Sequence, residues 1–243
     1  MRLTILGTAA PYPRPDNPCS GYLVQQGDTS IWVDAGTGTL AELQRHVALR
    51  DLDAIWISHA HADHTADLLT AYYALRFAGP PRARPLPLIG PPGLVERMVG
   101  FLGHRSAAVI DEVFEVTEMR GWHDAVVGEM ALGWGPLDHG MPAFGLRVQA
   151  ADSVLAYSGD SAYCESLVEL AEGADLLLCE AGASQHPPTG AVHCTPEDAA
   201  LLASTAGAKH LLLTHCDAPD ARDRALAGFP SVELAVPGMT REV

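Results

Sequence analysis

The stretch HAHADHTADL (59–68), which directly follows the apolar run AIWIS (54–58), constrains this chain more than any other feature. It places three histidines and two aspartates within nine positions, where a buried strand is expected to leave its sheet. His59 and His61 are two residues apart, so their side chains project to the same side of an extended chain and can share one metal ion. So dense a group of metal-ligand residue types predicts a metal centre.

Asp63 and His64 follow, where the sequence HTADLLTAYYAL (64–75) predicts a helix. At the start of that helix they would face a second point close to the first. Two metal ions about 3.5–4 Å apart can activate water and clamp both oxygens of a phosphoryl displacement. Packing offers no competing reason for the pattern, because Ser, Asn or Lys would serve equally well in a solvated turn.

Length and composition favour a single globular domain over residues 1–243. The chain has 243 residues, 48% of them apolar, which is ample for a core that needs no disulfide or metal to fold. We find no signal-peptide core and no run of 18 apolar residues, so we expect a cytoplasmic protein that does not enter a membrane. The five cysteines form no C-x-x-C pair, which argues against a disulfide framework and a cysteine zinc site.

The net charge of −15 bears on the partners of the protein. Nucleic acid is bound chiefly by neutralising its phosphates, so large nucleic acid is not the expected partner. A small anionic substrate fits better, because bound divalent ions would supply positive charge locally. Arg76, Arg82 and Arg84 could reach a substrate phosphate from the rim of a site, but simple solvent exposure is the favoured interpretation of all three.

Apolar runs and amphipathic patterns along the chain predict an α/β protein. Strands are expected at 3–6, 30–34, 52–58, 86–90, 109–117, 125–135, 144–149, 153–160, 174–181 and 208–215. Helices are expected at about 38–49, 63–78, 92–103, 162–172, 195–206 and 219–227. Strands dominate the middle of the chain and helices are spread between them, which favours helices that cover sheets on their outer faces. The proline-rich segment 79–93 is expected to be an exposed loop with a strand inside it.

Further motifs complete a pattern that resembles the metallo-β-lactamase superfamily. Besides SHAHADH (58–64), the matching segments are VDAGTG (33–38), DHGMPAFGLRV (138–148), AYSGDS (156–161) and LLLTHCD (211–217). The resemblance implies a metal-dependent hydrolase with an αββα sandwich, in which two facing mixed β-sheets are flanked by helices.

The same resemblance implies a complete set of ligands for two metal ions. The first ion would be held by His59, His61 and His139, the second by Asp63, His64 and His215, and Asp160 would bridge them. Asp34 would orient the ligand loop without binding metal. Imidazole and carboxylate ligands suit Zn²⁺, and the oxygen ligands leave Mn²⁺ or Fe²⁺ open.

Within the superfamily, the chain is most similar to the ribonuclease Z and cyclic-nucleotide phosphodiesterase group. The matching segments are LTILGTAAPYP (3–13), CSGYLVQQGDTSIWVDAG (19–36) and HCTPEDAALLA (193–203). The resemblance implies that His193 contacts a phosphate oxygen or protonates the leaving group, that Glu180 orients His193, and that Asp63 orients the attacking water. His193 could instead be only a helix-entry residue, and His186 is a weaker candidate for its role.

One departure from that group affects the expected substrate. Ribonuclease Z enzymes carry a long arm that grips tRNA between the third-motif histidine and the bridging aspartate, whereas His139 and Asp160 are only 21 residues apart here. We therefore expect hydrolysis of a small, cyclic-nucleotide-like phosphodiester. The alternatives are RNA 3′ processing, hydrolysis of a lactone or carboxylic ester at the same metals, and metal binding without turnover. The resemblance also implies a homodimer, for which helix 63–78 offers an apolar face.

Overall fold

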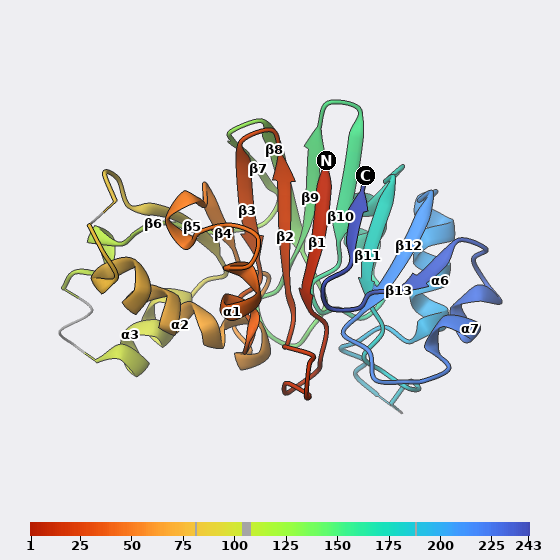
Figure 1. Ribbon diagram of the computed structural model, residues 1–243. Helices are drawn as coiled ribbons and strands as arrows, with labels where there is room; N and C mark the ends of the chain where they lie inside the picture. Colours follow the sequence, from red (N-terminus) through yellow and green to blue (C-terminus); the bar gives the residue numbers. More distant parts are fainter. Residues whose placement is uncertain (81, 104–107, 188) are drawn as a thin grey trace.

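Two seven-stranded β-sheets form the centre of the molecule (Figure 1). The computed structural model describes residues 1–80, 82–103, 108–187 and 189–243. The first sheet contains, in spatial order, β14 (Thr240–Glu242), β1 (Arg2–Gly7), β2 (Gly21–Gln26), β3 (Thr29–Val33), β4 (Ala54–Trp56), β5 (Leu86–Gly90) and β6 (Phe114–Glu118). The pairs from β14 to β3 are antiparallel and those from β3 to β6 are parallel, so the sheet is mixed.

The second sheet repeats this division into an antiparallel and a parallel half. It contains, in spatial order, β13 (Val232–Leu234), β12 (His210–Thr214), β11 (Leu176–Glu180), β10 (Ser153–Tyr157), β9 (Phe144–Ala150), β8 (Met130–Pro136) and β7 (His123–Val127). The pairs from β7 to β10 are antiparallel, and those from β10 to β13 are parallel.

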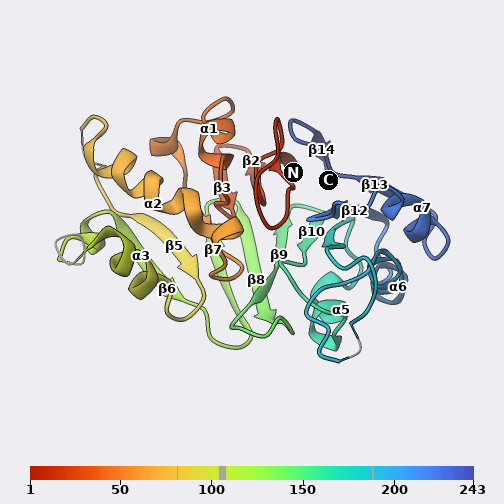
Figure 2. The same ribbon diagram turned by 90° about the horizontal axis from the view of Figure 1, so that it is seen from below.

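Helices cover the outer face of each sheet. The first sheet carries α1 (Thr39–Leu43), α2 (Ala62–Phe77) and α3 (Leu94–Leu102), and the second carries α5 (Glu165–Ala171), α6 (Pro196–Ala206) and α7 (Ala221–Leu226). Figures 1 and 2 show these two groups on opposite sides of the sheets. Two short 3₁₀ helices, η1 (Leu49–Asp51) and η2 (Ile110–Glu112), also belong to the first half. The predicted αββα sandwich is therefore confirmed.

Three apolar clusters hold these four layers together. Trp56 and Trp134 belong to the cluster between the sheets, Trp32 to the cluster under α1–α3, and Leu202 to the cluster under α5–α7. Successive side chains of a strand point to opposite faces, so a strand buried on both sides supplies two clusters. In β1, for example, Ile5 faces the other sheet while Leu6 faces the helices.

Helix α6 shows how local sequence sets the boundaries of an element. Thr195 accepts a hydrogen bond from the backbone N–H of Asp198, whose side chain accepts one in return from Thr195 N–H, which completes a capping box. Pro196 occupies the first turn, and Gly207 ends the helix with φ of 67°. The helix predicted over 195–206 is therefore confirmed, together with its capping residue.

The main differences from the predicted elements concern short strands. The run 125–135 contains a hairpin, because Gly128 turns the chain with φ of 54° between β7 and β8. Strands β2, β13 and β14 were not predicted; the last two have three residues each, too few to show a periodic pattern. No helix of the described chain combines the length and apolar character that a membrane span requires.

Candidate metal centre

The side chains that the sequence assigns to the site lie at the carboxyl ends of strands or in the segments that follow them. The first half of the chain contributes Asp34 after β3, His59 and His61 after β4, and Asp63 and His64 in the first turn of α2. The second half contributes His139 after β8, Asp160 after β10, Glu180 at the end of β11, His193 before α6, and His215 after β12. The site is therefore assembled from both sheets.

The first donor cluster consists of His59, His61, His139 and Asp160, whose ligand atoms lie within 4.8 Å of one another. His61 Nδ1 is 2.9 Å from His59 Nε2 and 3.1 Å from His139 Nε2. Asp160 Oδ2 is 3.7 Å from His59 Nε2 and 3.9 Å from His139 Nε2. Ligand atoms about 2.0–2.2 Å from a tetrahedral ion are roughly 3.3–3.6 Å apart, so this cluster suits one metal ion.

The second donor cluster consists of Asp63, His64 and His215. Asp63 Oδ2 lies 3.8 Å from His64 Nε2 and 3.9 Å from His215 Nε2. Asp160 also faces this cluster, with Oδ1 at 3.3 Å from His64 Nε2 and Oδ2 at 3.4 Å from His215 Nε2. A single carboxylate thus lies within reach of both clusters, as a bridging ligand must.

Two orphaned polar atoms support a cation at this centre. His64 Nε2 and Asp160 Oδ1 are buried and, although they lie 3.3 Å apart, neither makes a hydrogen bond among the described residues. Buried polar atoms are normally paired, and an imidazole nitrogen beside carboxylate oxygens is a donor set that divalent metals bind. The residues at this centre therefore fit a divalent metal ion.

The ionisation of the histidines bears on metal binding. Burial lowers the pKa of His215 to about 4 and also lowers the pKa of His59, because the charged imidazolium loses its hydration. Neutral rings are the form that binds metal. Burial disfavours charged His64 too, but the charges of Asp160 and Asp34 outweigh it and raise the pKa of His64. A proton and a metal ion therefore compete for this ring.

Asp34 orients two of the histidines through hydrogen bonds. Its Oδ2 accepts from His64 Nδ1 at 2.7 Å and from Ser58 Oγ at 2.8 Å, and its Oδ1 accepts from the Ser58 backbone N–H at 2.7 Å. Ser58 Oγ in turn lies 3.0 Å from His59 Nδ1. Because Nδ1 of both rings is engaged, Nε2 is the atom left to face a metal.

The turn that carries Asp34 packs directly against the first turn of α2. Ala35 N–H donates to the His64 carbonyl at 2.7 Å. A Cβ atom at Gly36 would lie 2.1 Å from the Asp63 carbonyl oxygen, so only glycine allows this approach. Asp34 itself has φ of 55°, a conformation that costs energy for a non-glycine residue and recurs at functional sites. The VDAGTG segment thus fixes the position of Asp63 and His64 in the first turn of α2.

His193 and Glu180 form a hydrogen-bonded pair next to the second cluster. His193 Nδ1 donates to Glu180 Oε1 at 2.9 Å, and the buried Glu180 side chain also accepts the backbone N–H groups of Ser161 and Gly182, both at 2.8 Å. Burial raises the pKa of Glu180 to about 7. Burial opposes the charged form of His193 as well, but the hydrogen bond and charge of Glu180 outweigh it and raise the pKa of His193. His193 therefore keeps a proton readily and has Nε2 free to transfer one.

Sequence patterns gave no sign of one further contact at the centre. The backbone carbonyl of Val192 accepts a hydrogen bond from His139 Nδ1 at 2.8 Å, which orients this ring as Ser58 orients His59. Any residue type supplies such a carbonyl, so no motif could have identified Val192. The contact also ties the segment that carries His193 to a residue of the first cluster.

The other candidates from the sequence lie apart from the donor clusters. Arg76 pairs with Glu112 at 2.6 Å, and Arg82 donates to backbone carbonyls of 50 and 52, at the amino end of β4 and opposite the centre. His186 pairs with Asp198, with 3.3 Å between Nε2 and Oδ2. The arginine that does contact the ligand loop is Arg97, which donates to the Ala60 carbonyl at 3.1 Å.

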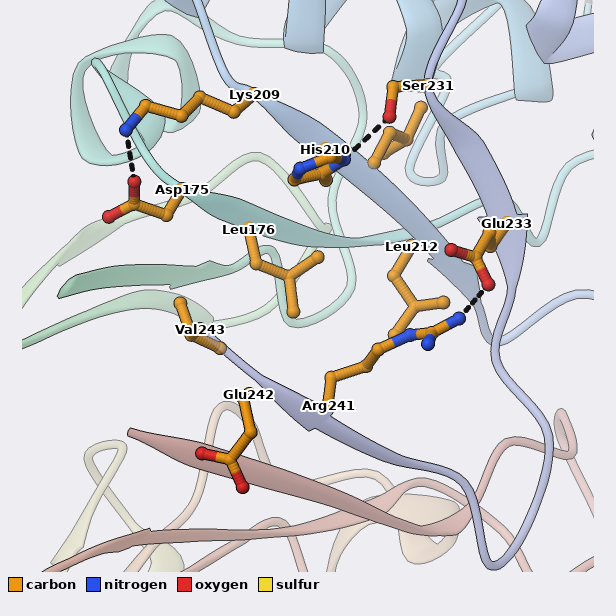
Figure 3. A pocket seen from close by; sticks show the side chains of 11 residues that line it. Asp175, Leu176, Lys209, His210, Leu212, Ser231, Glu233, Arg241, Glu242 and Val243 are labelled. Atoms are coloured by element: carbon orange, nitrogen blue, oxygen red, sulfur yellow. Dashed lines mark hydrogen bonds and ion pairs between the residues drawn. The ribbon is translucent and has the colours of Figure 1, made fainter.

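A cavity of about 370 Å³ lies at the other ends of the strands of the second sheet (Figure 3). Its lining includes Asp175 and Lys209, which form an ion pair at 2.5 Å, and Arg241 and Glu233, which also pair. It lies beside the amino ends of β11 and β12, whereas Glu180 and His215 lie at their carboxyl ends. This cavity is therefore separate from the donor clusters.

Comparison with known proteins places this site in a family. The β-lactamase superfamily domain matches residues 29–216. The Mycobacterium tuberculosis protein Rv1339 is 34% identical over 224 residues, which cover 88% of this chain and 80% of that protein. Ribonuclease Z of Mycobacterium sp. strain KMS is 34% identical over 272 residues, which cover 96% of this chain and 93% of that protein.

Solved structures are similar over the whole chain. The metallo-β-lactamase fold protein YhfI from Bacillus subtilis has a TM-score of 0.87 and 27% identity, covering 100% of this chain and 98% of its own. The short form of human tRNase Z has a TM-score of 0.80 and 23% identity, covering 100% of this chain and 99% of its own. The similarity to the human enzyme, at 23% identity, shows a shared fold and not a shared activity.

Proposed function

The chain belongs to the metallo-β-lactamase superfamily of metal-dependent hydrolases, and we propose that it hydrolyses a small phosphodiester, with cyclic nucleotides as the favoured class. The observation that carries this proposal is the pair of donor clusters that share Asp160, with the His193–Glu180 pair beside them. Two adjacent cation sites suit a reaction in which negative charge develops on several phosphoryl oxygens.

We assign seven ligands to two divalent ions, with Zn²⁺ as the favoured metal and Mn²⁺ or Fe²⁺ as alternatives. His59, His61 and His139 would hold the first ion, Asp63, His64 and His215 would hold the second, and Asp160 would contribute to both. When bound, the two ions supply the Lewis acidity that makes water a nucleophile at neutral pH and neutralises charge on the phosphoryl oxygens.

The remaining chemistry belongs to side chains of this chain. Asp63 has a carboxylate that can orient the attacking water while it contributes to the second cluster. His193 donates a proton from Nε2 to the alkoxide that leaves, and Glu180 holds the ring by accepting from Nδ1 and stabilises its charged form. A protein that only bound metal would not need the His193–Glu180 pair. The presence of this pair therefore favours an enzyme over a metal-binding protein without turnover.

The short connection between β9 and β10 supports a small substrate. β9 ends at Ala150 and β10 begins at Ser153, so the segment between His139 and Asp160 is mainly a tight hairpin. It leaves no room for an arm that could grip a folded RNA. The net charge of −15 also disfavours long polyanions, whereas a single phosphodiester can be held by the two metal ions.

RNA 3′ processing is the second candidate function. It is favoured by the 34% identity to a mycobacterial protein named ribonuclease Z, which extends over 96% of this chain. The two proposals share a metal centre and differ only in how the rest of the substrate is held. A lactone or carboxylic ester substrate would use the same metals but would not require His193 to protonate an alkoxide bound to phosphorus.

A panel of four substrates separates these proposals. The metal-loaded protein would be assayed on cyclic AMP, bis-p-nitrophenyl phosphate, a lactone and a precursor tRNA under matched conditions. We expect hydrolysis of both small phosphodiesters and only background rates on the lactone. Turnover of the lactone alone would exclude a phosphodiesterase, and site-specific trimming of the tRNA faster than cleavage of cyclic AMP would exclude the small-substrate proposal.

A further inference from the structure

Two buried hydroxyl groups connect one sheet to the metal-ligand histidines of the other half of the molecule, Ser20 directly and Tyr157 through Asp34. Tyr157 Oη, on β10 of the second sheet, donates to Asp34 Oδ2 at 2.7 Å. Asp34 Oδ2 also accepts a hydrogen bond from His64 Nδ1 at 2.7 Å. Tyr157 therefore acts on His64 through Asp34, and both Tyr157 and Asp34 are almost wholly buried.

Ser20 makes the reciprocal contact. It precedes β2 of the first sheet, and its Oγ lies 3.0 Å from Nδ1 of His215, which follows β12 of the second sheet. Ser20 is completely buried, and His215 has φ of 50°, so the ring is held in a costly backbone conformation. An oxygen partner at Nδ1 turns the Nε2 lone pair of His215 toward Asp63 and Asp160.

We propose that Tyr157 and Ser20 are positioning residues for the second metal ion, each orienting a ligand that belongs to the opposite half of the molecule. This inference rests on the binuclear centre proposed above. By fixing Nδ1 of His64 and His215, the two hydroxyls keep Nε2 of both rings directed at one point. The second metal site is then complete only when the two sheets are correctly packed against each other.

The phenol of Tyr157 has the chemistry that this role needs. Burial and the nearby charge of Asp34 raise its pKa well above the usual range, so it stays a neutral O–H donor. A phenol that donates to Asp34 leaves the carboxylate free to accept from His64. Removing a group that is hydrogen-bonded directly to a metal ligand, as Ser20 is to His215, typically changes metal affinity by about 10–100-fold. Tyr157 lies one hydrogen bond further from the ligand, so its removal should have a smaller effect in the same direction.

The first metal site is oriented differently. His59 is held by its sequence neighbour Ser58, and His139 by the carbonyl of Val192, which belongs to the same half of the molecule. Neither contact crosses between the sheets. Ser58 Oγ does donate to the Asp34 oxygen that Tyr157 contacts, so Tyr157 reaches His64 through one intervening side chain and His59 through two. Loss of the Tyr157 or Ser20 hydroxyl should therefore weaken binding of the second ion more than binding of the first.

Thr29 offers a control outside the site. Its Oγ1 accepts from the backbone N–H of Glu129 at 3.1 Å, which joins β3 of the first sheet to the turn between β7 and β8 of the second. Thr29 is 5% exposed and lies at the amino end of β3, whereas Asp34 follows the carboxyl end of the same strand. Thr29→Val thus removes a buried hydroxyl contact between the sheets without changing a partner of the metal-ligand histidines.

The experiment measures metal ions per chain as a function of chelator concentration for the wild type, Tyr157→Phe, Ser20→Ala and Thr29→Val. We expect Ser20→Ala to lose one of two ions at about 10–100-fold lower chelator concentration, and Tyr157→Phe to shift in the same direction by less, whereas Thr29→Val follows the wild type. The melting temperatures of the metal-free proteins give a second measurement. Thr29→Val should lower the melting temperature without changing metal retention, which separates a metal effect from a loss of core stability.

Three outcomes would overturn the inference. In the first, Tyr157→Phe and Ser20→Ala retain both ions at wild-type chelator concentrations, which contradicts the positioning role alone. In the second, Thr29→Val loses an ion as readily as Tyr157→Phe and Ser20→Ala, so the effect reflects general loosening of the contact between the sheets. In the third, the wild type binds at most one ion, and the binuclear centre fails together with the inference.

Discussion

At the scale of single residues, substitution of His193 distinguishes a role in proton transfer from a role in metal binding. The only hydrogen-bond partner of His193 among the described residues is Glu180, so removing the ring breaks no hydrogen bond to the seven ligands, although the ring packs against those of His139 and His215. We expect His193→Ala to keep both metal ions while turnover of cyclic AMP falls by about 10²–10⁴-fold, the usual contribution of a positioned general acid. The fall should be smaller for bis-p-nitrophenyl phosphate, whose phenolate leaves without a proton. Rates on both substrates and elemental analysis of the variant test this.

Other results would assign His193 differently. Its Nδ1 is 3.9 Å from Asp160 Oδ2, and Asp160, His193 and His215 form a third group of donors. Loss of an ion from His193→Ala would therefore identify it as a ligand. Equal losses of rate on both substrates would show that it holds a phosphate oxygen, and unchanged rates would leave it a helix-entry residue, with His186 next to be substituted.

Glu180 should act only through His193. Replacing it with Gln keeps the shape and one oxygen that can accept from His193 and Ser161. It removes the charge that stabilises the protonated ring and the second oxygen, which accepts from the Gly182 N–H. We expect Glu180→Gln to lower turnover of cyclic AMP by about tenfold or more, with metal content unchanged, and to add little to the loss in a His193→Ala background. Rate losses that multiply in the double variant would contradict an action through His193.

At the scale of elements, we predict that the hairpin between β9 and β10 limits the substrate to small phosphodiesters. Because this connection carries no long arm that could grip RNA, cleavage of cyclic AMP should exceed maturation of precursor tRNA by orders of magnitude under matched conditions. Initial rates on the two substrates, measured on one preparation, provide the test. Efficient trimming at a defined 3′ position would show that other surfaces of the protein grip the RNA.

The elements and residues that sequence predicted are those with strong local signals. Metal ligands are limited to a few residue types at fixed spacing, so the segment from His59 to His64 predicts a metal centre from sequence alone. Helix α6 is delimited by its own capping residues. The roles of Ser20 and Tyr157 leave no such signal, because hydroxyl residues are common and their contacts join segments more than 100 residues apart. The edge strands β13 and β14 were missed because three residues carry no periodicity.

At the scale of the whole molecule, we predict that two chains associate through the outer surface of α2. Tyr73 and Phe77 are 47% and 69% exposed, and their rings stack with 6.0 Å between centroids. We expect light scattering to give about twice the 25.7 kDa mass of one chain at micromolar concentration. The double variant Tyr73→Ser/Phe77→Ser should be monomeric, whereas Val126→Ser, at a 76% exposed site on β7, should not change the mass. A monomeric wild type would refute this prediction.

The measurement that tests the account most directly is the metal dependence of cyclic AMP hydrolysis. AMP formation would be followed for the protein stripped by chelator and then titrated with Zn²⁺, alongside the Asp160→Ala variant. We predict that stripping abolishes activity, that it returns in full only near two ions per chain, and that Asp160→Ala does not recover it. Full activity with one ion or none, or no cleavage of cyclic AMP and bis-p-nitrophenyl phosphate at any metal loading, would contradict a binuclear phosphodiesterase.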